Sequence, residues 1–73
     1  MPARYSLDRG TRVTITTGKY AGCQAIIDAN VYDKSADYPE ERAPGFQVTV
    51  FVGEEQGWAT VRVEQISLTQ HHQ

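Results

Sequence analysis

The sequence predicts an all-β fold, a small barrel of four to five antiparallel strands, and three observations lead to this prediction. Apolar residues alternate with polar ones along several short runs, which is typical of strands that bury one face. No stretch of about 11 or more residues repeats its apolar positions with the period of a helix. The chain has only 73 residues, and a small sheet with one apolar face must curl on itself to cover that face.

Two alternating runs form the first half of the predicted sheet. In "TRVTITT" (residues 11–17), Val13 and Ile15 lie on one side of the strand. In "QAIIDANVY" (residues 24–32), the apolar residues at every second position share a face, namely Ala25, Ile27, Ala29 and Val31. Gly18 and Gly22 bracket the connection between the runs, and glycine adopts positive φ angles at little cost. We therefore interpret these two glycines as structural residues of a tight turn.

Two further runs and a short C-terminal segment complete the predicted sheet. "FQVTVFV" (46–52) and "WATVRV" (58–63) flank "GEEQG" (53–57), a polar connection typical of a β-hairpin. After Val63, a single 3₁₀ turn and a last short strand are expected. The predicted core consists of the inward-facing apolar residues Val13, Ile15, Ile27, Ala29, Val31, Val48, Val50, Val61, Val63, Ile66 and Leu68.

The segment 33–45, "DKSADYPEERAPG", is predicted to be an exposed loop between the second and third strands. It contains two prolines, a glycine and six charged residues, a composition typical of loops. A connection of this length is long for so small a domain, and long loops are often functional or disordered.

Length and composition limit the class of protein. We expect a single domain over residues 1–73, with a core at about 9–68 and a flexible tail at 69–73. Cys23 is the only cysteine, so the chain has no disulfide framework and no cysteine-rich zinc site. The apolar runs are far shorter than a membrane span needs, and the N-terminus lacks the apolar segment of a signal peptide. We therefore expect a cytoplasmic protein, complete from Met1.

Charge is distributed unevenly along the chain. The formal net charge is −2, whereas generic nucleic-acid binders are usually strongly basic. Residues 1–22 hold four basic residues and one acid, but residues 23–73 hold three basic residues and eight acids. One end of the molecule is therefore expected to present a basic face although the whole chain is acidic.

The first strand, the glycine turn and the second strand together resemble a KOW motif. Gly10, Val13, Ile15, Gly18, Gly22 and Ile27 follow the spacing of that family, with Ala25 where a third glycine is usual. The resemblance covers about 22 residues of the 73. It implies an SH3-like barrel that binds RNA, or that docks on a ribosome or RNA polymerase surface in transcription or translation. KOW proteins of the ribosome are usually basic around this turn, and this chain is acidic.

Two binding surfaces are candidates. The first is a nucleic-acid or partner surface made of cations and one ring, because single-stranded binders combine phosphate contacts with base stacking. Its residues are Arg9, Arg12, Lys19, Tyr20 and Arg62. The second is an aromatic protein-binding face of Tyr38, Phe51 and Trp58 without nucleic-acid binding, as SH3-like barrels use to hold peptides. Alternatively, Trp58 covers one end of the core. Lys19 and Tyr20 have a similar alternative, in which they are solvated turn residues without a binding role.

No catalytic, metal or cofactor site is predicted. Cys23 is expected to be a half-buried thiol, and His71 and His72 are adjacent in a tail, which is unsuited to a shared metal. The acids of the 33–45 segment are interpreted as a solvated cluster. A dihydrofolate reductase family uses a barrel of this size with a V-Q-I-Y strand, which "WATVRV" does not match. We therefore expect a binding module and not an enzyme.

Overall fold

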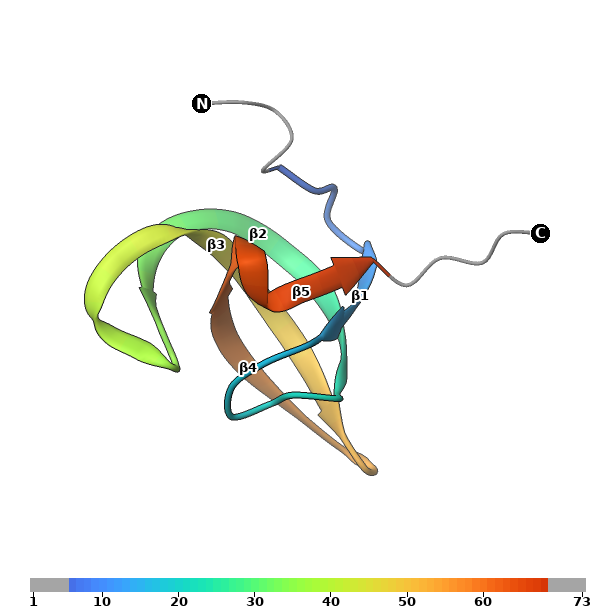
Figure 1. The fold of residues 1–73 in the computed structure, drawn as a ribbon. Coiled ribbons are helices and arrows are strands. Elements are labelled where there is room, and N and C mark those ends of the chain that lie inside the picture. The colour runs from blue at the N-terminus through green and yellow to red at the C-terminus, as the bar shows by residue number, and fades with distance from the viewer. Residues whose placement is uncertain (1–5, 69–73) are drawn as a thin grey trace.

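The computed structural model describes residues 6–68 as one antiparallel sheet of five strands, in the order β4-β3-β2-β1-β5 (Figure 1). The strands are β1 (Arg12–Ile15), β2 (Gln24–Ser35), β3 (Tyr38–Val52), β4 (Glu55–Arg62) and β5 (Ile66–Leu68), and the 3₁₀ turn η2 (Val63–Gln65) links β4 to β5. The sheet curls into the predicted small SH3-like barrel. The outer strands β4 and β5 do not pair with each other, so the barrel is not closed by hydrogen bonds between strands.

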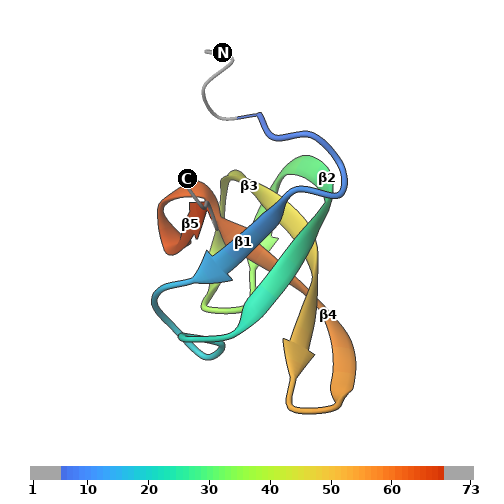
Figure 2. The same cartoon turned by 90° about the vertical axis from the view of Figure 1, so that its right-hand side faces the viewer.

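The two shortest strands, β1 and β5, are held in place by pairing with neighbouring strands. β1 pairs on one side with β2, where Val13 lies opposite Ala25, and on the other with β5, where Val13 lies opposite Leu68. Figure 2 shows β1 lying between these two strands. β5 is joined to β4 by η2 and brings the C-terminal end of the sheet beside its N-terminal strand. The predicted turn followed by a last strand is thus present.

The segment 33–45 is not the exposed loop that its composition predicts. β2 and β3 run on through it as one long curved hairpin, and only Ala36 and Asp37 lie between the two strands (Figure 1). Both prolines of the segment are tolerated because they lie where β3 extends past its last pair with β4, Gly45 opposite Arg62. A register shift between Asp33 and Ser35 accommodates the irregular part of β3.

The core is made of alternating residues from four strands. The fully buried apolar residues are Val13, Ile15, Ala25, Ile27, Phe46, Val48, Val50 and Val61. Six of them are predicted core residues; Ala25 and Phe46 are additional. Val63 and Ile66 are half-buried against this core.

The prediction is wrong for Ala29, Val31 and Leu68. The pairing of β2 with β3 shifts register between Ile27 and Ala29, which places the extra residue Asp28 in β2. A shift of one residue exchanges the two faces of a strand, so Ala29 and Val31 leave the core face and are only half-buried. Leu68 is 49% exposed because it lies on the outermost strand.

The curvature of the long hairpin brings its tip back onto the sheet. The Ala36 backbone N–H donates to the Thr60 carbonyl oxygen at 3.0 Å, so the tip of β2–β3 is tied to β4. Gly45 lies at this bend, where a Cβ atom would collide with the Val61 backbone carbonyl. The strands approach this closely only because position 45 has no side chain.

Candidate functional site

The turn between β1 and β2 adopts the glycine-dependent conformation that the sequence predicts. Gly18 and Gly22 have φ angles of +90° and +89°, in the region that other residues enter only with strain. The Gly22 N–H donates to the Ile15 carbonyl at 2.7 Å, and the Ala21 N–H donates to the Gly18 carbonyl at 3.1 Å. Residues 18–22, called the glycine turn below, therefore owe their glycines to backbone geometry.

The glycine turn also contacts the tip of the β2–β3 hairpin. The Lys19 backbone N–H donates to Asp37 Oδ1 at 2.9 Å. A Cβ at Gly18 would collide with the Asp37 carboxylate and would approach the side-chain amide of Gln65. Gly18 therefore permits a close approach as well as a positive φ angle, whereas a Cβ at Gly22 would meet open space.

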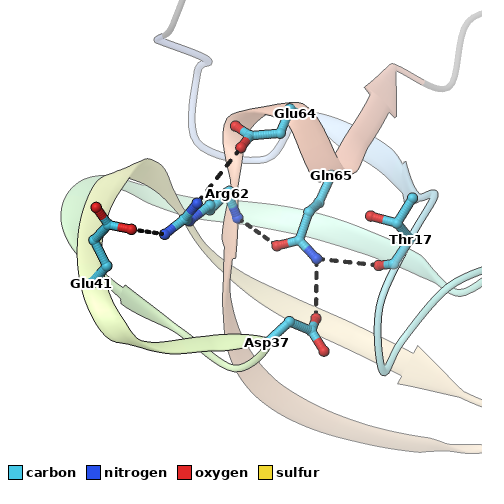
Figure 3. A network of polar contacts seen from close by, with 6 residues as sticks. All are labelled: Thr17, Asp37, Glu41, Arg62, Glu64 and Gln65. Atoms are coloured by element: carbon cyan, nitrogen blue, oxygen red, sulfur yellow. Dashed lines mark hydrogen bonds and ion pairs between the residues drawn. The ribbon is translucent and has the colours of Figure 1, made fainter.

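Gln65 joins this contact to the end of β4 (Figure 3). Its side chain is 1% exposed, and its Nε2 donates to Asp37 Oδ2 at 3.0 Å and to the Thr17 carbonyl at 3.3 Å. Its Oε1 accepts the Arg62 backbone N–H at 2.9 Å. Asp37 is therefore a structural residue that holds two turns together, and it does not belong to a solvated acidic cluster. Sequence reasoning gave no role to Gln65, because its burial depends on segments far apart in the chain.

Arg62 is enclosed by its neighbours. Its side chain is 15% exposed, and it lies 3.6 Å from Glu41 and 4.0 Å from Glu64. Its guanidinium lies 4.0 Å from the centre of the Tyr38 ring, a cation–π contact. Arg62 and Tyr38 thus contact each other, although they belong to different predicted surfaces.

The predicted basic surface is divided between separate places. Lys19 and Tyr20 lie together in the glycine turn, with Lys19 Nζ 5.5 Å from the centre of the Tyr20 ring. Arg9 is exposed in the loop before β1, and Arg12 is exposed at the first position of β1. Arg9 lies before β1 and Arg12 begins it, whereas the glycine turn follows its other end and Arg62 is enclosed at the end of β4, so the structure does not gather the five residues into one compact patch.

The predicted aromatic surface is partly assembled. Trp58 is 88% exposed, which excludes the alternative that it covers the end of the core. Phe51 lies two positions beyond Thr49, the cross-strand partner of Trp58, so Phe51 and Trp58 are diagonal neighbours on one face. Tyr38 lies near the other end of β3, against Arg62, and is not part of this face.

Register pairs define the outer face of the sheet on which Trp58 lies. One row crosses four strands, because Arg12 pairs with Ile26, Ile26 with Thr49, and Thr49 with Trp58. We call this row, together with Phe51 and Asp28, the Trp58 face. A hollow of about 600 Å³ opens on it, lined by Asp28, Gln47, Val48, Thr49, Trp58, Ala59 and Thr60.

The remaining candidate residues from the sequence are Cys23 and the two adjacent histidines. Cys23 is half-buried with a free thiol, as expected. His71 and His72 lie outside the described residues. Within residues 6–68, no group of three or more histidine, cysteine or acidic side chains is placed to hold a metal ion. In the same part of the chain, no helix has the length and apolar character needed to cross a membrane.

Comparison of the chain with protein-family models, with curated proteins and with solved structures gave no match. The KOW resemblance therefore rests on the residues of the glycine turn and its flanking strands, and it stays a prediction.

Proposed function

We propose that this chain is a non-enzymatic module that binds a protein partner through the Trp58 face. The observation that carries the proposal is the 88% exposure of Trp58 on a regular, paired strand. Tryptophan is among the residues most enriched at the energetic centres of protein interfaces, where it fills a pocket of the partner. Phe51, the diagonal neighbour of Trp58, and Ile26, on the far side of Thr49, extend the apolar surface of this face.

The polar surroundings of Trp58 favour a defined interface. Gln47, Thr49 and Thr60 line the adjoining hollow, and such side chains supply hydrogen bonds around an apolar anchor. Two strands carry most of this face and pair with each other over eight residue pairs, so the anchor stands on a rigid support. We also propose that the protein acts in the cytoplasm and needs no cofactor.

Random-peptide selection tests this function. Peptides selected on the immobilised chain are titrated against the wild type, Trp58→Ala and Lys19→Ala. We expect Trp58→Ala to weaken binding by about tenfold or more, the loss of a central aromatic anchor. Lys19→Ala, a change in the glycine turn, should leave the affinity unchanged. Equal binding by the wild type and Trp58→Ala would contradict the proposal.

A second candidate function is binding of RNA, or of a ribosome or RNA polymerase surface, through the glycine turn, as the KOW resemblance implies. The observation in its favour is that Lys19 Nζ and the Tyr20 ring lie together at this turn, 5.5 Å apart. A cation and a ring side by side suit a phosphate and a stacked base. Arg9 and Arg12 would extend the contact at low salt.

An amide NMR titration with a short single-stranded RNA tests the second candidate. Lys19, Tyr20 and Gly22 should shift together at low salt, and the shifts should fade at about 0.3 M salt because phosphate contacts release counterions. A Lys19→Gln variant should lose most of the shifts, while Lys34→Gln, an equal charge change in the β2–β3 hairpin, should keep them. No movement of these amides at low salt would rule this candidate out.

A further inference from the structure

The hollow beside Trp58 has the chemistry to recognise a positive charge. We propose that it binds a lysine or arginine side chain from a basic segment of the partner protein. The inference rests on the protein-binding function proposed above and specifies what the Trp58 face selects.

Thr49 places an aromatic ring and a carboxylate on its two sides. It lies directly opposite Trp58 in the pairing of β3 with β4, where Cβ atoms are about 4.5–5.5 Å apart. On its other side, its hydroxyl donates to Asp28 Oδ2 at 2.8 Å. Asp28 is the extra residue at the register shift of β2, and it lines the same hollow as Trp58. Asp28 follows Ile26 on the outer face of β2, so Thr49 lies between an aromatic ring and a carboxylate.

Within the part of the chain that the structure describes, neither wall of the hollow is paired with a cation. Tyr38 and Tyr20 each have a cation over the ring, from Arg62 and Lys19. Among residues 6–68, no cation lies over the Trp58 ring and no cation pairs with Asp28. Tryptophan is the aromatic side chain that binds cations most strongly, and a carboxylate next to it adds a charge-assisted hydrogen bond.

The charge of the molecule favours a basic occupant at this place. Residues 23–73 hold eight acids against three basic residues, and β4 begins at Glu55, directly after Glu54. Arg12 is at the opposite end of its row, with Ile26 and Thr49 between it and Trp58. The field at the hollow therefore attracts a cation and repels the phosphates of a nucleic acid.

NMR titration with defined peptides tests the inference. The probe is a capped peptide of alternating arginine and glycine residues, and the control peptide carries citrulline, the neutral isostere, at each arginine position. We expect the Trp58 indole N–H and the Thr49 and Thr60 amides to shift with the arginine peptide and to stay in place with the citrulline peptide.

Protein variants separate the two walls of the hollow. Asp28→Asn retains an oxygen for the Thr49 hydroxyl but removes the charge, so it should weaken binding of the arginine peptide about threefold. Asp8→Asn, the same charge change in the exposed loop before β1, should leave binding unchanged. Trp58→Leu keeps an apolar side chain without a ring and should weaken binding of the arginine peptide about three- to fivefold. The affinity of Trp58→Phe should lie between those of the wild type and Trp58→Leu.

The outcomes distinguish this inference from the proposed function. Equal shifts with the arginine and citrulline peptides, or unchanged binding by Asp28→Asn, would overturn recognition of a cation while leaving Trp58 as a protein contact. If single-stranded RNA moves the Trp58 signals and neither peptide does, both the inference and the protein-binding function are wrong.

Discussion

Gln65 is the residue on which the contact between the turns depends most. Its buried amide holds Asp37, Thr17 and the Arg62 backbone, so Gln65→Leu would leave buried polar groups without partners. Each such group costs about 1–3 kcal/mol, and we expect the free energy of unfolding to fall by about 3 kcal/mol. Urea denaturation followed by far-UV circular dichroism measures this. Gln56→Leu, on the exposed part of β4, is the control and should stay within about 0.5 kcal/mol of the wild type.

The two glycines of the glycine turn differ in what surrounds them. Gly18 and Gly22 have nearly the same φ angle, but only Gly18 has neighbours in the place of a Cβ atom. Alanine at either position should cost about 1–2 kcal/mol of backbone strain. Gly18→Ala should cost about 1–2 kcal/mol more, because the Asp37 carboxylate must move and release its hydrogen bonds.

A double-variant cycle checks the cause of this difference. In an Asp37→Ala background the carboxylate is gone, so the additional cost of Gly18→Ala should largely disappear. Coupling of this kind is expected for residues in direct contact. Additive costs of Gly18→Ala and Asp37→Ala would contradict the contact between the glycine turn and the hairpin tip.

Among the elements, the β2–β3 hairpin departs most from the sequence prediction. Prolines and charges in 33–45 predict a loop, since each of these residues is disfavoured in the interior of a sheet. This part of the hairpin is an edge with solvent beside it, where prolines and charges are tolerated and even protect against unwanted pairing. Most residues of 33–45 are exposed, as their composition predicts. The composition does not distinguish the two structures, because exposed residues of an edge strand and of a loop are of the same types.

The bend of this hairpin depends on Gly45. A Cβ at position 45 would collide with the backbone carbonyl of Val61, and backbone cannot move aside as the end of a side chain can. Gly45→Ala should therefore lower the free energy of unfolding by about 1–3 kcal/mol, measured by urea denaturation. It should also weaken protection of the Ala36 amide from hydrogen exchange, because that amide bonds to Thr60 on β4.

Gly57→Ala is the matched control for the bend. Gly57 is also in a β-strand, but a Cβ there would meet open space and its φ angle is not positive. Alanine should therefore be neutral or should stabilise the protein by about 0.4–1 kcal/mol, since it restricts the unfolded chain. If both substitutions had equal effects, the close approach at Gly45 would not be what shapes the hairpin.

On the scale of the whole molecule, the sequence predicts the barrel better than its surfaces. Period-two alternation and glycines locate the strands, because these signals are local and repeated. Tyr38 and Glu41 reach Arg62 only because the β2–β3 hairpin curves back toward β4. No local sequence pattern predicts this curvature. Alternation places Asp28 on the outer face with Ile26, but only the strand pairing shows that it lies across Thr49 from Trp58.

Unfolding of the whole domain can be followed through the fluorescence of Trp58. Trp58 is the only tryptophan and is 88% exposed, so its emission in the folded monomer should already resemble that of tryptophan in water. Urea should therefore change the circular dichroism cooperatively while the emission maximum moves little. Trp58→Leu should leave the urea midpoint almost unchanged, as for most exposed positions.

Phe46→Ala is the contrasting variant. Phe46 is 1% exposed, and its truncation should cost about 3–5 kcal/mol, enough to unfold much of so small a domain.

A blue-shifted native emission of the wild type that returns toward that of exposed tryptophan on dilution would contradict an exposed Trp58 in solution. It would mean that a second copy covers the Trp58 face, so that the partner of this face is the chain itself.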